Sequence, residues 1–262
     1  PLCFNEEHGC GYRDEDGKLH GTYPTFAVRG MMQRLYRVVK DPNPDAIIDV
    51  HSSFGYNPSG LAYADVMWTG EQWHHLRYTG TENIADELTL DKLRTEFTGR
   101  QLGIAAETLH YRLRNPMKIA ATTLLLDVSP RLSTGAYDNA AQSKDSYFVL
   151  IPDLWAMRDE FGADDAEKLF YYENEDYVSV SGEEAYATLL KHPSNGTLAV
   201  ISNRSREAQE ITVKFELDEL GLEGEPLQVS NPLSEEVVEM DEEGQISVAL
   251  GSEEWCYVWL KP

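Results

Sequence analysis

The stretch from Ile47 to His75, IIDVHSSFGYNPSGLAYADVMWTGEQWHH, holds two short apolar runs, and each run ends in chemically capable side chains. The first, residues 46–50, delivers Asp49 and His51. Apolar runs of this length indicate buried strands rather than an amphipathic helix. Because the strands of a βα barrel carry chemistry at their carboxyl ends, this stretch predicts an enzyme built on parallel strands.

The second run, residues 61–68, leads into two tryptophans with a carboxylate between them: Glu71 lies between Trp68 and Trp73. A carboxyl group beside apolar rings is expected to have a raised pKa, which suits a general acid. Indole faces also stack on sugar rings. We therefore predict Glu71 as an acid/base residue and the two tryptophans as sugar platforms. The alternative is that Glu71 caps a loop or pairs with an arginine.

Asp49 and His51 are two residues apart on a predicted strand, so their side chains share one face. Such a pair can hold sugar hydroxyls, form a buried hydrogen bond or ligate a divalent metal. The metal is the minority interpretation, since no second pair of this kind ends another predicted strand. Asp65 lies inside the second run and is expected to make a structural hydrogen bond.

Asp49 and two further carboxylates are candidates for the catalytic partner, because glycoside hydrolysis uses a pair of them. Glu107 ends a short predicted strand over residues 104–109, and Asp127 ends an apolar run over residues 122–128. Either acid can instead be an ion pair that holds a loop. The remaining predicted substrate contacts are nearby basic residues, namely His74, Arg112 and Arg131.

Predicted helices over residues 23–40, 89–102 and 146–161 alternate with these strands, which favours a parallel α/β architecture. About four strands fall within residues 1–167, whereas a complete barrel needs eight. We therefore expect a partial (βα) barrel. It would be completed by a missing amino-terminal barrel half or by a homo-oligomer partner. The remaining alternative is a smaller open sheet.

From residue 168 onward, short predicted strands follow one another, with turn signals such as Asn195-Gly196 between them. This pattern indicates an antiparallel β-sandwich over residues 168–262, so the fold class is α/β plus all-β. The tail carries Trp255, Tyr257 and Trp259 at alternate positions. We expect them in the last core strand rather than in a carbohydrate-binding strip.

The chain has 262 residues and a formal net charge of −23. Residues 173–262 alone carry 20 acidic and 5 basic side chains. An acidic chain repels phosphate, so neither nucleic acid nor an anionic membrane is an expected partner. Glycine-rich nucleotide motifs and a G-x-S-x-G elbow are missing from the sequence, which gives no support for a nucleotide cofactor or a serine hydrolase.

The cysteines are Cys3, Cys10 and Cys256, and no C-x-x-C spacing occurs. We therefore expect no zinc ribbon. Apart from the minority interpretation of Asp49 and His51, no metal site is predicted. A disulfide between Cys3 and Cys10 is conceivable, but unpaired thiols are favoured. The cysteine count does not decide the compartment; a periplasmic or extracellular bacterial location is favoured.

Long strings of the sequence resemble a known family. They include GCGYRDEDGKLHGTYPTFAVRGMMQRLY (residues 9–36), the stretch over residues 47–77, ELTLDKLRTEFTGRQLGIAAETL (87–109) and LGSEEWCYVWLKP (250–262). They look like the carboxyl-terminal half of large bacterial glycoside-hydrolase-like proteins related to the family 123 β-N-acetylhexosaminidases. The resemblance implies a βα barrel followed by a β-sandwich, with a further β domain and the first barrel strands upstream.

That family uses an adjacent Asp-Glu pair, with the acetamido group of the substrate as nucleophile. In this chain the pairs Asp14-Glu15, Asp86-Glu87 and Asp159-Glu160 fall in a loop, before a helix and in a helix, so none ends a predicted strand. From the strand-end residues and the resemblance together, we predict a glycoside hydrolase fragment acting on glycosidic bonds. The alternatives are a non-catalytic glycan-binding or scaffold protein, and a metal-dependent hydrolase that uses Asp49 and His51.

Overall fold

The computed structural model describes residues 2–51, 58–69, 84–96, 98, 103–109, 116–131, 147–224 and 226–262. They form two compact units, residues 1–68 with 99–105, and residues 69–98 with 106–262. Among the described residues no helix has the length and apolar character needed to cross a membrane. Predicted residues Glu71, Trp73, His74 and Arg112 lie outside the described residues.

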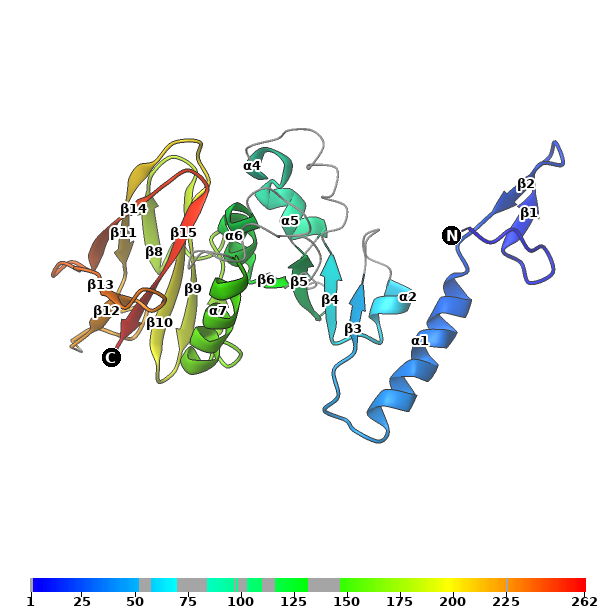
Figure 1. Cartoon of the computed structure of the whole chain (residues 1–262), viewed down its shortest axis with the longest axis horizontal. Helices are drawn as coiled ribbons and strands as arrows, with labels where there is room; N and C mark the ends of the chain where they lie inside the picture. The colour runs from blue at the N-terminus through cyan, green and yellow to red at the C-terminus, as the bar shows by residue number, and fades with distance from the viewer. Residues whose placement is uncertain are drawn as a thin grey trace. The chain divides into compact units, whose positions relative to one another are not determined.

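The first unit begins with an antiparallel hairpin and one long helix (Figure 1). The expected helix over residues 23–40 is confirmed as α1, but most of its apolar side chains stay exposed. Phe26 is 86% exposed and Val38 is 72% exposed, whereas Met32 is buried. The elements of this unit are β1 (Gly11–Arg13), β2 (Leu19–Gly21), α1 (Thr25–Lys40), β3 (Asp49–His51), α2 (Pro58–Leu61) and β4 (Val66–Thr69), of which Thr69 falls in the second unit.

The second unit opens with helices and a parallel pair of strands. The expected strand over residues 104–109 is confirmed as β5, which pairs in parallel with β6. The expected strand over residues 122–128 is wrong, because those residues end α6 and form the 3-10 helix η3. The elements are α4 (Ile84–Glu87), α5 (Leu90–Glu96), β5 (Ala105–Leu109), α6 (Pro116–Thr123), η3 (Leu124–Leu126), β6 (Ser129–Arg131) and α7 (Tyr147–Phe161).

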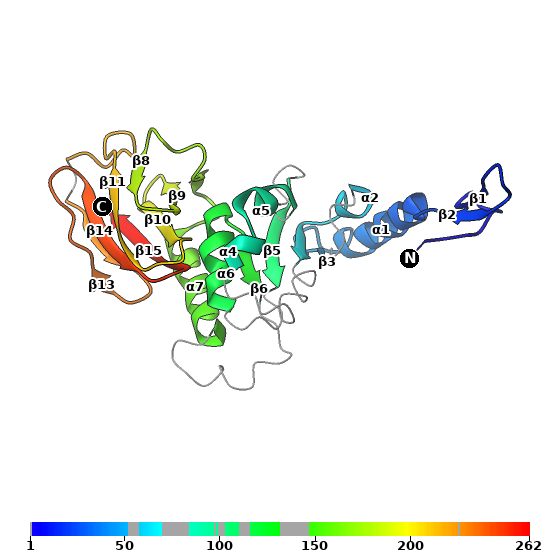
Figure 2. The same cartoon turned by 90° about the horizontal axis from the view of Figure 1, so that it is seen from above.

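The expected run of strands after residue 168 is confirmed, and Figure 2 shows two sheets packed face to face. In the described part of the chain, six strands form one sheet in the order β13-β12-β15-β10-β9-β7, and three form the other in the order β14-β11-β8. The strands are β7 (Glu167–Leu169), β8 (Val178–Ser181), β9 (Ala185–His192), β10 (Gly196–Asn203), β11 (Gln209–Phe215), β12 (Gln228–Asn231), β13 (Glu236–Val237), β14 (Gln245–Leu250) and β15 (Glu254–Lys261).

The six-stranded sheet is covered on both faces. Every residue of β10 is buried, and its side chains alternate between two cores. Ala199 and Ile201 pack in the core between the sheets, whereas Leu198 and Val200 pack against α6, η3 and α7. Strand β11, at the centre of the smaller sheet, buries alternate residues instead, as expected for a half-buried strand.

Polar side chains tie the helical layer to this sheet. The hydroxyl of Thr188 donates a hydrogen bond of 2.7 Å to the carbonyl of Leu125. The guanidinium of Arg204, which is buried, donates to the hydroxyl of Thr122 at 3.0 Å and to the carbonyl of Leu88 at 2.9 Å. Because helix ends leave carbonyls without intrahelical partners, these side chains satisfy groups that the fold would otherwise bury unpaired.

The aromatic tail confirms the expectation of a core strand. Tyr257 is 0% exposed and Trp259 is 6% exposed, and both belong to the core between the sheet and the helices. The indole nitrogen of Trp259 donates a 2.7 Å hydrogen bond to the carbonyl of Asn195. These rings are therefore occupied by packing.

We predict that Leu198→Ala destabilises the second unit by about 2–5 kcal/mol, because it opens a cavity between the sheet and the helices. Denaturant unfolding followed by circular dichroism measures the change. Val237→Ala is the control, since Val237 is 76% exposed and should change stability by less than about 0.5 kcal/mol. Equal effects of the two substitutions would contradict the burial of β10.

Candidate functional site

The candidate site of the first unit lies on β3 and β4, which pair in parallel. The register sets Asp49 opposite Val66, and His51 opposite Trp68. The imidazole of His51 lies flat on the indole of Trp68, with ring centroids 3.8 Å apart and planes inclined by 6°. The sequence thus predicted correctly that Asp49 and His51 share a face, and the structure adds Trp68 to that face.

Burial explains why the reactive residues are on this side of the pair. Met67 alternates with Trp68 and is fully buried, which turns the neighbouring indole to the opposite face. Asp49 and His51 are exposed and Trp68 is half-buried. An aromatic surface next to a carboxylate and an imidazole can bind a ligand that is partly apolar and rich in hydroxyl groups, as a sugar ring is.

Asp65 has the structural role that its position inside the apolar run predicted. Its carboxylate accepts a 2.8 Å hydrogen bond from the backbone N–H of Ile48, and it pairs with the ammonium of Lys40 at 2.9 Å. The Ile48 N–H and then Lys40 lower the pKa of Asp65. Asp65 therefore ties the end of α1 and the start of β3 to β4.

Asp127 does not end a strand. It follows η3 in the left-handed conformation, with φ of 55°, and it precedes β6. Its carboxylate lies 2.5 Å from the guanidinium of Arg158 and also pairs with Lys168. Burial lowers the pKa of Arg158, but Asp127 and then Tyr257 raise it more, so the arginine stays charged. The structure thus places Asp127 in an ion-pair network at the amino end of β6.

Glu107 borders a hollow in the second unit. The hollow has a volume of about 590 Å3, and Glu107, Trp155, Arg158 and Asp159 are among the residues that line it. It lies beside the carboxyl end of α7 and next to the pair of Asp127 with Arg158. Sequence reasoning missed Trp155, because its position in the middle of a helix gave no signal. Arg131, predicted as a substrate contact, is the last residue of β6.

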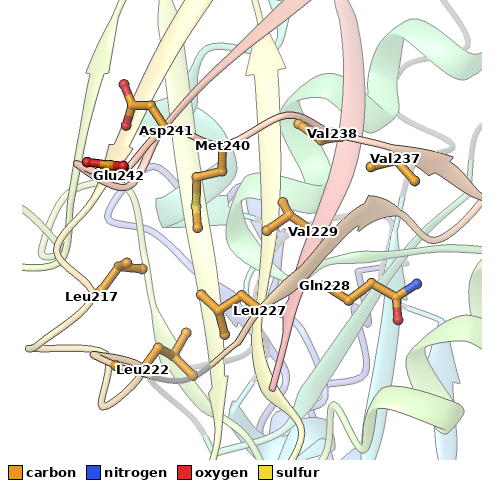
Figure 3. A pocket seen from close by; sticks show the side chains of 11 residues that line it. Leu217, Leu222, Leu227, Gln228, Val229, Val237, Val238, Met240, Asp241 and Glu242 are labelled. Carbon is orange, nitrogen blue, oxygen red and sulfur yellow. The ribbon is translucent and has the colours of Figure 1, made fainter.

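A second hollow opens on the sandwich, where Figure 3 shows mostly aliphatic side chains around it. Its volume is about 540 Å3, and Leu217, Leu227 and Met240 are among its lining residues. Asp241 and Glu242 lie at one side of it. The lining contains no aromatic ring among the described residues, so it offers no ring on which a sugar could stack.

The carboxyl-terminal part of the chain matches a known family. Residues 152–249 match the family described as glycoside hydrolase 123, C-terminal domain. Over these residues the chain resembles the carboxyl-terminal domain of the family 123 glycoside hydrolases. No curated protein matches the sequence.

Solved structures of low identity share the fold. A noncanonic maltogenic alpha-amylase from Thermotoga neapolitana has a TM-score of 0.55 at 11% identity, over 98% of this chain and 73% of that one. An Anoxybacillus alpha-amylase has a TM-score of 0.53 at 12% identity, over 89% of this chain and 56% of that one. A GH27 β-L-arabinopyranosidase from Geobacillus stearothermophilus has a TM-score of 0.52 at 12% identity, over 93% of this chain and 55% of that one. The chain therefore spans little more than half the length of the latter two.

We predict that Asp127→Ala costs about 3–5 kcal/mol of stability, because it leaves the buried guanidinium of Arg158 unpaired. Thermal unfolding measures the loss. Asp127→Asn is the matched control, since asparagine tolerates the left-handed conformation and keeps an acceptor oxygen, so it should cost less. If Asp127→Asn is as stable as the wild type but abolishes an activity of the chain, Asp127 is catalytic and the structural assignment fails.

The lowered pKa of Asp65 predicts a pH-dependent contribution to stability. A carboxylate whose pKa is lower in the folded than in the unfolded state stabilises the fold above its unfolded pKa of about 4, and this contribution is lost as the pH falls through the folded pKa. Asp65→Asn should therefore lower the free energy of unfolding by about 1 kcal/mol at neutral pH. This is less than the loss expected for a buried ion pair, because the Asp65 side chain is 37% exposed. The difference from wild type should shrink between pH 5 and about 3; a constant difference in unfolding free energy would contradict this mechanism.

Proposed function

We propose that this chain supplies part of a carbohydrate-active enzyme that hydrolyses glycosidic bonds. The observation that carries the proposal is the strand face on which the exposed residues Asp49 and His51 meet half-buried Trp68 at a parallel strand pair. The family match over residues 152–249 gives the same reaction class independent support.

In this proposal the two parallel pairs, β3 with β4 and β5 with β6, are arcs of one (βα) barrel that spans residues 1–167, and residues 168–262 are its sandwich domain. The exposed apolar side chains of α1 fit a helix that another part of a barrel would cover, since exposed apolar patches of this kind mark interaction surfaces. Completion of the barrel by an upstream half or by a second copy stays a prediction.

We assign Trp68 as a platform for a sugar ring and Glu71 as the general acid that protonates the leaving oxygen. Glu71 follows β4 by two residues, so it is near enough along the chain to approach a sugar held on Trp68. Asp49 is the proposed partner carboxylate, and His51, Trp73 and His74 are proposed substrate contacts. A separation of about 5–5.5 Å between the two carboxyl groups would give retention, and about 6.5–9.5 Å would give inversion.

Glu107 is proposed as a second substrate contact or partner acid through the hollow that it shares with Trp155. Arg112 and Arg131 keep their proposed roles as substrate contacts. We no longer assign Asp127 to the reaction, since its carboxylate is held by Arg158 and Lys168.

A glycan-binding protein without catalysis is the main alternative, because the face of Trp68 serves binding as well as cleavage. The metal-dependent alternative is weaker. Within the part of the chain that the structure describes, Asp49 and His51 do not belong to any cluster of three potential metal ligands.

We predict that Glu71→Gln lowers kcat on aryl β-N-acetylhexosaminides or other aryl glycosides by about 100-fold or more, because general acid catalysis contributes that much. Trp68→Ala should instead raise KM roughly tenfold, which corresponds to about 1.4 kcal/mol of binding. Release of the aryl group by the wild-type chain measures both. Glu243→Gln, at an exposed turn of the sandwich, is the control and should leave both constants unchanged.

The outcomes separate the alternatives. Sugar binding by calorimetry that Trp68→Ala weakens, with no aryl release by the wild type, supports a binding protein and overturns the catalytic proposal. Full activity of Glu71→Gln would contradict the role of that residue. Activity that a chelator removes and added zinc or manganese restores would support the metal-dependent alternative.

A further inference from the structure

The amino-terminal hairpin brings together three side chains that the glycosidase proposal does not use. The sulfur atoms of Cys3 and Cys10 and a ring nitrogen of His8 all lie within 4.8 Å of one another. The Sγ atom of Cys3 is 3.6 Å from Nε2 of His8. The structure leaves all three cysteines of the chain as free thiols. The short distances among Cys3, His8 and Cys10 therefore do not come from a disulfide.

Backbone hydrogen bonds to Thr22 hold the two cysteines side by side. Cys3 and Thr22 exchange both backbone hydrogen bonds, at 2.8 and 3.1 Å. The N–H and the hydroxyl of Thr22 also donate to the carbonyl of Cys10, at 3.0 and 2.9 Å. One residue of the hairpin thus fixes both ends of the loop that carries His8.

Two glycines close this loop. Gly9 has φ of 78°, a left-handed conformation that turns the chain between His8 and Cys10. The N–H of Gly11 donates to the carbonyl of Asn5 at 2.8 Å, and a Cβ atom on Gly11 would lie 2.2 Å from the carbonyl oxygen of Phe4. The backbone of this loop therefore passes so close to the hairpin that only glycine fits, and this closure sets the positions of the sulfur atoms.

We propose that Cys3, His8 and Cys10 bind one zinc ion, with water in the fourth position. Thiolate sulfur and imidazole nitrogen are the ligands that zinc prefers, at about 2.3 and 2.0–2.1 Å. Tetrahedral angles then separate a sulfur and a nitrogen ligand by roughly 3.5 Å, which agrees with the 3.6 Å between Cys3 and His8. Small side-chain rotations bring the third ligand to the same centre, because its atom already lies within 4.8 Å of the other two.

The spacing C-x-x-x-x-H-x-C explains why the sequence pattern gave no signal. Zinc ribbons and fingers are recognised by pairs of cysteines two to four residues apart. Here the ligands are adjacent because a hairpin partner, Thr22, holds Cys3 beside Cys10. The expectation of no zinc ribbon rested on the cysteine spacing, and this cluster falls outside that pattern.

A zinc ion at this position would cross-link the loop to the hairpin. The hairpin is small and exposes apolar side chains, including Phe4 at 50% and Tyr12 at 53%, so burial alone stabilises it little. Metal binding contributes free energy to folding wherever the unfolded chain offers no preformed site. The metal would then order the amino-terminal hairpin without taking part in glycoside cleavage.

The test uses the whole chain, reduced and freed of metal by a chelator, and titrated with zinc or with cobalt as a spectroscopic probe. We expect one ion per chain, a thiolate-to-cobalt charge-transfer band and visible bands of tetrahedral cobalt. Cys3→Ser, Cys10→Ser and His8→Gln should each weaken binding about 100-fold or more, since loss of an outer-shell partner alone weakens such sites 10–100-fold.

Matched controls separate a site from chance binding. Cys256→Ala removes a thiol on β15, and His20→Gln removes an imidazole from the same hairpin; both should keep one tightly bound ion. Gly11→Ala keeps every ligand but displaces the loop, so it should weaken binding as well.

Three results would overturn the proposal. The first is a reduced chain that takes up no metal. The second is tight binding that survives His8→Gln and both serine variants. The third is a chain that is isolated, with zinc present, as a Cys3–Cys10 disulfide, which mass spectrometry before and after reduction detects. None of these readouts depends on glycosidase activity, so this inference and the proposed function can fail separately.

Discussion

The burial of β10 on both faces is the constraint on which the second unit depends. A strand that is buried throughout needs a layer of structure on each side, and here the smaller sheet supplies one and α6, η3 and α7 supply the other. Strand β10 therefore packs against the helices on one face and against the smaller sheet on the other. This explains why the family match begins at residue 152, inside α7, rather than at the first strand of the sandwich.

Polar side chains make this arrangement specific. Apolar contact alone would let the helices slide over the sheet, because hydrophobic burial is not directional. Thr188 and Arg204 reach across the boundary and satisfy named backbone carbonyls of the helical layer. A buried arginine that lost those acceptors would bear the full cost of an unpaired charge, so the layers are fixed in one register. The ion pair of Asp127 with Arg158 does the same between β6 and α7.

The sequence predicted the sandwich well and the α/β part less well, for physical reasons. Strands of the sandwich alternate in polarity or end at turn residues, and both signals are local. The run TTLLLDV reads as a buried strand, yet it belongs to α6 and η3, because a short apolar run surrounded by protein looks the same in either conformation. Asp127 was misplaced for the same reason. The pairing of His51 with Trp68 could not be predicted at all, since it depends on the register between strands that the sequence does not encode locally.

The candidate chemistry and the stability of this chain therefore come from different features. Residues that fix the fold are buried and stand in apolar runs or at alternate apolar positions, as Leu198 and Tyr257 do. The residues proposed to contact a ligand, such as Asp49 and His51, are exposed, so burial places no demand on their identity. An aromatic ring that stays partly exposed on a strand face is accordingly a stronger sign of function than the same ring packed in the core. By this criterion Trp68 beside His51 points to a binding face, whereas Trp259, with its ring buried and its nitrogen bonded to Asn195, does not.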